Sequence, residues 1–145
     1  LGLQVATHPR WLTVCNIAAP RTRLEAKFSY AQVLAMAMLG YDTAMLTSYG
    51  DEAVQDPGVL ALRSRVTVVG DARLAETAAT VTLDLADGTV QTARFDLDTP
   101  LTMPERRHKI RTKAASLIGP ERAEQAWAIL NQPEARASDF GALLG

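Results

Sequence analysis

The sequence predicts an α+β fold, in which a small, mostly antiparallel sheet has helices packed on one face. Three observations predict it: β-rich stretches lie on both sides of a helical block, an Asp-Gly pair marks a hairpin, and the last third returns to helical periodicity. A chain of 145 residues buries about 70% of the surface that its unfolded form exposes. We therefore expect residues 1–145 to form a single domain with its own core.

The first strand is expected near Leu3–Thr7, and the clearest helix over Tyr30–Leu39. Ser29 is a good N-cap for this helix, and Gly40 stands where a left-handed terminator is expected. Because residues 33–39 are apolar all round, we expect this helix to be buried on every side, against the sheet, or to be covered by a second domain.

Two shorter helices are expected next along the chain. Asp42 can cap a helix that runs through Ser48 and is ended by Gly50. Asp56 is the expected N-cap of the following helix, Gly58–Leu62, with a proline at its first position. Both predictions depend on capping chemistry.

The other strands are expected in three β-rich runs, over residues 65–69, 79–85 and 90–97. The pair Asp87-Gly88 is a strong signal for a two-residue hairpin loop between the last two strands. Such a loop would pair Leu85 with Val90, but it would leave Phe95 on the face opposite the apolar side chains of the preceding strand. A bulge or a longer turn is the alternative, so the register stays open.

The C-terminal third returns to helix. Pro104 opens a helix over residues 105–118, a Gly-Pro pair breaks it, and a second helix with an apolar stripe follows over residues 121–130. A last helical turn is expected over residues 139–144. We expect these helices to complete the helical part of the fold.

Composition excludes several classes of protein. The formal net charge is −1, whereas general nucleic-acid coats carry strongly basic domains. The longest apolar run, residues 33–39, is far too short to span a bilayer. The single cysteine, Cys15, is expected to be a buried or half-buried thiol and fits a reduced compartment. We therefore expect a cytoplasmic protein that binds neither nucleic acid nor membrane.

No pattern in the sequence predicts a metal site, a phosphate-binding loop or a nucleophile elbow. His8 and His108 are isolated from Cys15 and from any spaced pair of carboxylates. The most basic run, residues 106–113, could touch RNA or an acidic partner. Because no aromatic residue interleaves with it, a solvated helix face is the favoured interpretation.

The first 30 residues form a basic zone. Their net charge is +3, whereas that of residues 31–60 is −4. The zone leads into the start of the helix Tyr30–Leu39, where backbone N–H groups also favour anions. Arginine binds a carboxylate with two parallel hydrogen bonds, so the zone suits a di- or tricarboxylic acid, with scattered surface cations as the alternative. The positively charged or ionisable side chains of the zone are His8, Arg10, Arg21, Arg23 and Lys27.

The chain starts at Leu1 instead of a methionine, and its first residues already alternate as in a strand. This pattern indicates a piece of a longer protein. Trimming of an ordinary N-terminus is the alternative. A longer protein would also supply a covering domain for the apolar helix.

The same basic zone resembles the MmgE/PrpD family. The Asp-Gly turn with its strand over residues 81–89 and the proline-marked return to helix over residues 100–113 extend the resemblance to about residue 130. Members of the family include 2-methylcitrate dehydratase, cis-aconitate decarboxylase and iminodisuccinate epimerase. The matching segments of the zone are His8-Pro9-Arg10, Val14-Cys15-Asn16-Ile17, Pro20-Arg21-Thr22 and, above all, Leu24-Glu25-Ala26-Lys27-Phe28-Ser29-Tyr30.

The resemblance implies a larger enzyme. Family members have a large helical domain and a smaller α/β lid domain, with the active site between them, usually as homodimers and without a metal or organic cofactor. The chain matches the lid, with residues 120–145 interpreted as the return into the helical domain. The implied partners are therefore the missing helical domain, a second copy of the full-length protein and a small polycarboxylate substrate.

The implied reaction is dehydration, decarboxylation or epimerisation next to a carboxylate of a di- or tricarboxylic acid. It needs a general base, and cations that stabilise the carboxylate as it takes enolate character. The resemblance assigns substrate binding to the lid, with Arg10, Arg21 and Lys27 as carboxylate clamps, His8 as a hydrogen-bond donor and Ser29 as helix cap or ligand contact. The catalytic residues of the helical domain are not in this chain, so we expect it to be inactive alone. A stand-alone binding or interaction module without catalysis is the alternative.

Overall fold

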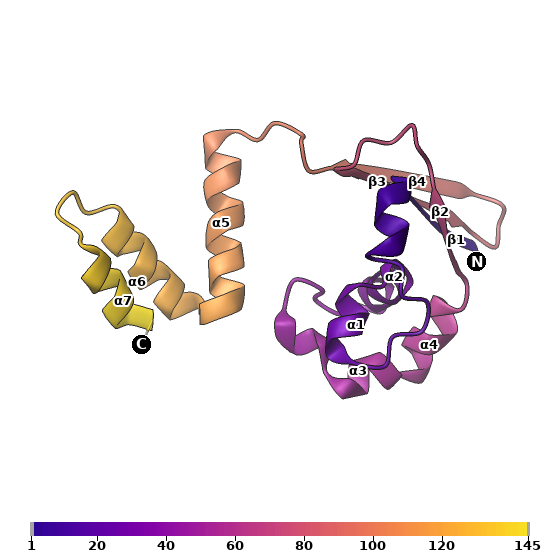
Figure 1. The fold of residues 1–145 in the computed structure, drawn as a ribbon, viewed down its shortest axis with the longest axis horizontal. Helices are drawn as coiled ribbons and strands as arrows, with labels where there is room; N and C mark the ends of the chain where they lie inside the picture. The colour runs from indigo at the N-terminus through magenta and orange to yellow at the C-terminus, as the bar shows by residue number, and fades with distance from the viewer. Residues whose placement is uncertain (1, 145) are drawn as a thin grey trace. The chain divides into compact units, whose positions relative to one another are not determined.

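The computed structural model describes residues 2–144, and their contacts divide the chain into two compact units. The first unit runs to residue 99, and the second begins at residue 100 and also includes residues 44–46. The four-stranded sheet lies in the first unit, and helices make up the second (Figure 1). The sequence-based prediction of a single domain, with residues 120–145 as a return into a helical domain, stays a prediction.

The elements are, in chain order, β1 Gly2–Thr7, the 3-10 helix η1 Pro9–Thr13, α1 Arg23–Lys27, α2 Tyr30–Met38, the 3-10 helix η2 Leu46–Tyr49, α3 Asp51–Gln55, α4 Pro57–Arg63, β2 Val66–Gly70, β3 Ala78–Asp84, β4 Val90–Asp96, α5 Met103–Ile118, α6 Pro120–Leu130 and α7 Ala137–Leu144.

The sheet has the strand order β2-β1-β3-β4. β1 and β2 pair in parallel, whereas β1 with β3 and β3 with β4 pair antiparallel. Side chains alternate between the two faces of β1, and Leu3, Val5 and Thr7 form its buried set. The predicted α+β fold with a mostly antiparallel sheet is confirmed.

The start and the end of α2 follow the sequence signals. The Ser29 hydroxyl oxygen accepts a hydrogen bond from the backbone N–H of Gln32 at 3.2 Å, and Gly40 follows the helix with a φ of 84°. One face of α2 packs into the main apolar cluster, in which Met36 is 0% exposed. Within residues 2–144, α2 is not buried on every side, because α1, α4 and β2 leave residues 37–39 uncovered. Cover by a second domain stays a prediction.

The predicted helix over residues 42–48 is wrong. Only η2 forms there, and Gly50 precedes a short helix, α3, that the sequence analysis missed. The buried Tyr49 supplies the reason, because its hydroxyl donates a hydrogen bond to the carbonyl of Thr43 at 3.0 Å. Burial of Tyr49 in the apolar cluster thus ties this segment to the core, and residues 43–45 form a turn and a bend instead of a helix. The start of α4 is confirmed, since an Asp56 carboxylate oxygen accepts from the N–H of Val59 at 2.9 Å.

The β3–β4 hairpin has the longer turn that the sequence left open. Val90 pairs with Asp84 instead of Leu85, so the loop spans residues 85–89, with Gly88 at a φ of 84°. The loop is closed by a hydrogen bond from the N–H of Leu85 to the carbonyl of Thr89 at 2.8 Å. In this register Phe95 lies opposite Ala79, on the same face as the other apolar side chains of β3.

The helices cover only half of this sheet face. Helix α2 packs on β2, and the side chains of Leu3 and Val5 on β1 are buried. On the same face, Val81 and Leu83 of β3 are half-buried, and Phe95 of β4 is 58% exposed. An apolar half-face over β3 and β4 is therefore uncovered among the described residues.

The second unit consists of α5, α6 and α7. Thr102 and Glu105 form a reciprocal capping box at the start of α5, and Gly119, with a φ of 87°, separates α5 from α6. Ala123 and Ala126 of α6 are buried, whereas none of the described α5 side chains is. Both long helices are confirmed near their predicted bounds. No helix within residues 2–144 is long and apolar enough to cross a membrane.

Candidate carboxylate-binding site

Arg10 lies at the surface and already holds a carboxylate. Its guanidinium Nη1 is 2.6 Å from an oxygen of Glu76, which lies in the connection between β2 and β3. The same guanidinium stands over the ring of Trp11, 5.3 Å from the ring centroid. The indole N–H of Trp11 donates to the backbone carbonyl of Glu76 at 2.6 Å. We call Arg10, Trp11 and Glu76 the Arg10 cluster.

The start of η1 fixes the backbone of the Arg10 cluster. His8 is the N-cap residue, and its Nδ1 accepts a hydrogen bond from the N–H of Arg10 at 3.3 Å. Pro9 occupies the first turn, where a missing N–H costs nothing. The structure thus brings together two of the predicted site residues, His8 and Arg10, through their own local backbone.

The ion pair of the Arg10 cluster is open to solvent. The side chains of Arg10 and Glu76 are 61% and 48% exposed. An exposed ion pair stabilises a protein by about 0 to 1 kcal/mol, since water screens both charges. Loss of the contact between Arg10 and Glu76 would therefore cost the fold little stability.

A cavity of about 290 Å³ lies beside the Arg10 cluster. Its wall is mostly apolar and aromatic, and it continues the uncovered half of the sheet face. The hydroxyl of Tyr30 in this wall is 3.4 Å from the hydroxyl of the buried Thr7. The lining residues are Trp11, Tyr30, Glu76, Thr77, Ala78, Ala79, Phe95 and Leu97.

Arg21 precedes the N-cap of α1 and Lys27 is the last residue of α1, and both lie in different surroundings from Arg10. The backbone N–H of Arg21 donates to the Glu25 carboxylate at 2.6 Å, and its side chain is exposed. The ammonium of Lys27 stands over the ring of Tyr49, 5.5 Å from the centroid. Burial, and then the charge of Asp42, raise the pKa of Tyr49, so this ring is a neutral phenol at pH 7. Within residues 2–144, the side-chain partners of Arg10 are Glu76 and Trp11, whereas that of Lys27 is Tyr49.

Ser29 is a helix cap. It is 1% exposed, and its hydroxyl is engaged with Gln32. The N–H of Tyr30 donates to the carbonyl of Cys15 at 3.1 Å, and the N–H of Val33 to the carbonyl of Ser29 at 3.0 Å. The first backbone N–H groups of α2 are thus largely satisfied within the chain, and they add less to anion binding than the sequence suggested.

Sequence reasoning missed Glu76 and Trp11. The Glu76 side chain reaches Arg10 across 66 positions of the chain, and no local pattern marks such a pairing. Cys15 is half-buried, as predicted. Among residues 2–144, no three or more His, Cys, Asp or Glu side chains are grouped so that they could hold a metal ion.

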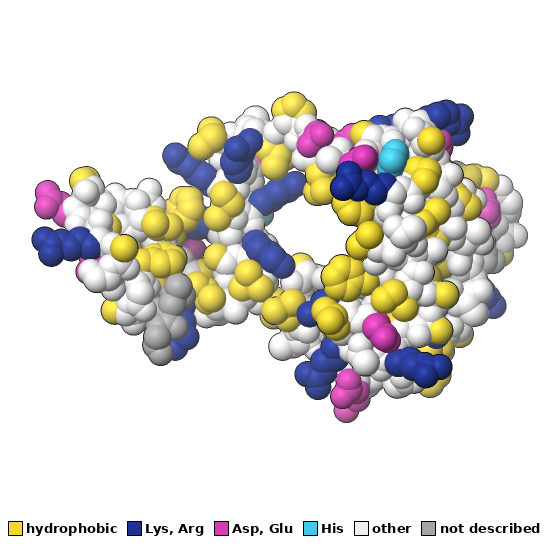
Figure 2. Space-filling model, in the orientation of Figure 1, with side chains coloured by type: hydrophobic (Ala, Val, Ile, Leu, Met, Phe, Trp, Pro, Cys, Tyr) yellow, Lys and Arg dark blue, Asp and Glu magenta, His cyan; other side chains and the backbone are white. Residues whose placement is uncertain are grey.

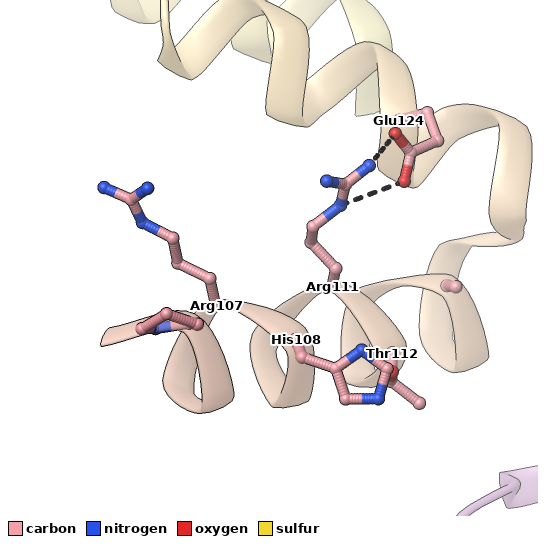
Figure 3. A pocket seen from close by; sticks show the side chains of 7 residues that line it. Arg107, His108, Arg111, Thr112 and Glu124 are labelled. Carbon is pink, nitrogen blue, oxygen red and sulfur yellow. Dashed lines mark hydrogen bonds and ion pairs between the residues drawn. The ribbon is translucent and has the colours of Figure 1, made fainter. Parts of the chain in front are cut away.

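A second cavity, of about 420 Å³, lies along α5, and Glu124 of α6 completes its wall. Figure 2 shows dark-blue Lys and Arg side chains gathered over α5. In the cavity, Arg111 reaches across to Glu124 on α6 and makes two hydrogen bonds, one of them from Nε at 3.2 Å (Figure 3). Its guanidinium stands 5.4 Å from the ring centroid of Trp127. The lining residues are Pro104, Arg107, His108, Arg111, Thr112, Ala115 and Glu124.

A comparison with known protein families identifies what the chain is similar to. The family described as the MmgE/PrpD C-terminal domain matches residues 2–133 of the chain. This range contains the Arg10 cluster, α1, α2, the whole sheet, α5 and α6. No curated protein matches the chain.

Proposed function

The chain belongs to the MmgE/PrpD family, as its C-terminal domain, and we propose that it is the lid of a lyase or isomerase that acts on a small di- or tricarboxylic acid. Proteins of this family are generally dehydratases and other lyases. In this proposal the reaction removes or moves a proton next to a substrate carboxylate. The chain supplies substrate binding and enclosure, and the general base comes from a partner domain.

The observation that supports the proposal most strongly is the Arg10 cluster. Arg10 faces solvent, Trp11 lies beneath its guanidinium, and a carboxylate oxygen of Glu76 occupies it at 2.6 Å. In the proposal, a substrate carboxylate takes the place of Glu76 on Arg10. A guanidinium held on an aromatic ring has lost part of its side-chain freedom before the substrate arrives, which lowers the entropy cost of binding.

The other predicted site residues take secondary roles in the proposal. Lys27 and Arg21 add positive potential that attracts a di- or tricarboxylic acid. His8 fixes the backbone of Arg10 and offers an imidazole beside it. Ser29 positions α2 as its cap. Such cations stabilise the negative charge that develops on the carboxylate during proton transfer.

The uncovered apolar half-face supports a partner domain. Val81, Leu83 and Phe95 belong to the same face that α2 covers at the other end of the sheet. Apolar side chains on one contiguous face tend to be covered by another domain or protein. The proposal therefore predicts no turnover by this chain alone, and homodimerisation only in the longer enzyme.

Titration of the chain with citrate, followed by NMR of its backbone amides, tests the proposal. We expect the largest shifts in residues 8–11 and 76, and an apparent Kd at least about tenfold weaker in Arg10→Gln, because a charge-assisted hydrogen bond is lost. Arg73→Gln is the matched control, since the exposed Arg73 also pairs with a loop carboxylate, that of the half-buried Asp71. We expect Arg73→Gln to bind citrate like the unaltered chain.

Two results would contradict the proposal. The first is an equal loss of citrate affinity in Arg10→Gln and Arg73→Gln, which would indicate general charge attraction. The second is turnover of 2-methylcitrate or cis-aconitate by the chain without another polypeptide. Binding that persists without any activity in the presence of a family helical domain would favour the stand-alone binding module instead.

A further inference from the structure

We propose that the cavity along α5 is a second ligand-binding site, for a small molecule that carries a carboxylate or a phosphate group. All of its lining residues come from the second unit, far along the chain from the Arg10 cluster. Its volume of about 420 Å³ is within the range of small-molecule sites in proteins. The proposal is independent of the proposed function of the lid.

Two partners on α6 orient Arg111 in this cavity. Glu124 accepts two of its N–H groups, through Nε and Nη2, and the ring of Trp127 lies 5.4 Å from its guanidinium carbon. A guanidinium has five N–H groups, so donors on Nη1 and Nη2 remain for a ligand. The carboxylate and the ring thus orient Arg111 without using all its donors, which reduces the entropy lost on binding.

Arg107 supplies the uncompensated charge. It precedes Arg111 by four residues, one turn of α5, and Figure 3 shows both side chains projecting from the same side of the helix. Side chains at this spacing have Cβ atoms about 5–6 Å apart. Among residues 2–144 the Arg107 side chain has no hydrogen-bond or ion-pair partner. The cavity wall thus has two guanidinium groups, those of Arg107 and Arg111, and one carboxylate, that of Glu124. The excess positive charge favours an oxyanion.

His108 and Thr112 line the neighbouring stripe of α5, again one turn apart. An imidazole and a hydroxyl can donate to, or accept from, the polar remainder of a ligand. The adjoining Arg106 does not line the cavity but adds positive potential around it. The chemistry of the site therefore fits a small acid or phosphate ester with further hydrogen-bonding groups.

NMR titration of the full chain with inorganic phosphate and, separately, with succinate tests this site at constant ionic strength. We expect saturable shifts confined to the amides of residues 107–112, 115 and 124 for at least one of the two probes. Shifts with phosphate alone assign the site to phosphate groups, and shifts with succinate alone assign it to carboxylates. Absence of saturable shifts at these residues with both probes would overturn the proposal.

A pair of neighbouring arginine variants separates a built site from general attraction. We expect Arg107→Ala to weaken binding about tenfold or more, and Arg106→Ala to weaken it less than about twofold, because only Arg107 lines the cavity. Equal losses in the two variants would overturn the proposal. Both side chains are exposed, so both variants should keep the far-UV circular dichroism of the unaltered chain.

Glu124→Gln tests the positioning role of Glu124. Removal of its charge strengthens anion attraction by simple Coulomb reasoning, but it also releases Arg111. If the orientation of Arg111 matters, affinity for the probe falls in Glu124→Gln, and the Nε–H resonance of Arg111 broadens. A rise in affinity without a change in that resonance would overturn this part of the proposal.

Discussion

The two tryptophans of the chain lie in clusters of the same composition that are built differently. Trp11 and Trp127 each lie beneath an arginine, at 5.3 and 5.4 Å, and each arginine binds a glutamate. In the first cluster, Glu76 is 66 positions from Arg10, whereas in the second, Glu124 is 13 positions from Arg111. The first cluster therefore depends on the sheet and its connections, and the second on a helical hairpin.

The difference shows that the same arginine–glutamate–tryptophan contact can form with different losses of chain entropy. Arg111 and Glu124 belong to adjacent helices, so a short loop brings them together with little loss of chain entropy. Arg10 meets Glu76 only after η1 and the β2–β3 connection have been placed by the sheet. Loss of the core should therefore disrupt the Arg10 cluster before the Arg111 cluster.

The largest expected effect is that of Met36→Ala. Met36 is fully buried in the cluster of α2, α3 and α4, and such a truncation costs about 2–5 kcal/mol of unfolding free energy. The two tryptophans are followed separately by fluorescence. A chain that carries Trp127→Phe reports the surroundings of Trp11, and one that carries Trp11→Phe reports those of Trp127. We expect Met36→Ala to lower the urea midpoint seen by Trp11 more than that seen by Trp127. An unchanged Trp11 transition would contradict the comparison.

Trp11→Phe is expected to have the next largest effect. The substitution keeps a ring beneath Arg10 but removes the indole N–H that donates to the Glu76 carbonyl at 2.6 Å. Loss of this hydrogen bond should reduce the free energy of unfolding by about 1 kcal/mol. Trp127→Phe is the matched variant, because its ring also lies beneath an arginine, and we expect a smaller loss from urea unfolding followed by circular dichroism. A larger loss in Trp127→Phe would reverse the comparison.

Glu76→Gln and Glu124→Gln should have small effects that depend on salt. Both ion pairs are exposed, so each should contribute less than about 1 kcal/mol, and Glu124, with two hydrogen bonds to Arg111, should contribute the more. At 1 M NaCl, where the Debye length is about 3 Å, both differences from the unaltered chain should nearly vanish. Glu134→Gln, at an exposed glutamate outside both clusters, is the control. Losses that persist at high salt would show that the carboxylates act through packing.

A third arginine–carboxylate pair, Asp71 with Arg73, is entirely local, and its effect should depend on pH. Hydrogen bonds from the Arg73 side chain and backbone lower the pKa of Asp71 from 3.8 to about 2. Since the folded-state pKa is depressed, the pair contributes stability above about pH 4 and loses it as the pH falls towards 2.

Urea unfolding of Asp71→Asn across this pH range provides the measurement. The difference in unfolding free energy from the unaltered chain should be constant above about pH 5 and should shrink between about pH 4 and pH 2. A difference that does not change with pH would mean that the Asp71 carboxylate contributes through shape and not through charge.

Local chemistry made several elements predictable. Ser29 and Asp56 mark helix starts because their side-chain oxygens accept hydrogen bonds from backbone N–H groups three residues later. Gly40 marks a helix end because a glycine readily adopts the positive φ found there. The break between α5 and α6 was predictable for the same reason, since Gly119 adopts a positive φ. The β-rich runs likewise gave strands near their observed bounds.

Long-range contacts explain the failures. The helix expected over residues 42–48 does not form, because Tyr49 is buried and takes the Thr43 carbonyl. The sequence left the hairpin register open, because it did not show on which face of the sheet the apolar side chains of β3 and β4 lie. In the structure, Asp84 pairs with Val90. The candidate site was predicted only in part, because the sequence marked Arg10 but not Glu76.

The sequence by itself thus determined the strands, the ends of α2, α4, α5 and α6, the basic zone and, through the segment around Ala26-Lys27-Phe28-Ser29, the family. Each of these depends on residues that are close in the chain. Only the tertiary structure decided that a carboxylate already occupies Arg10, that Ser29 is buried as a cap, and that half of a sheet face is uncovered. These features are set by contacts between distant residues, whose energies depend on burial and distance in the folded chain rather than on local pattern.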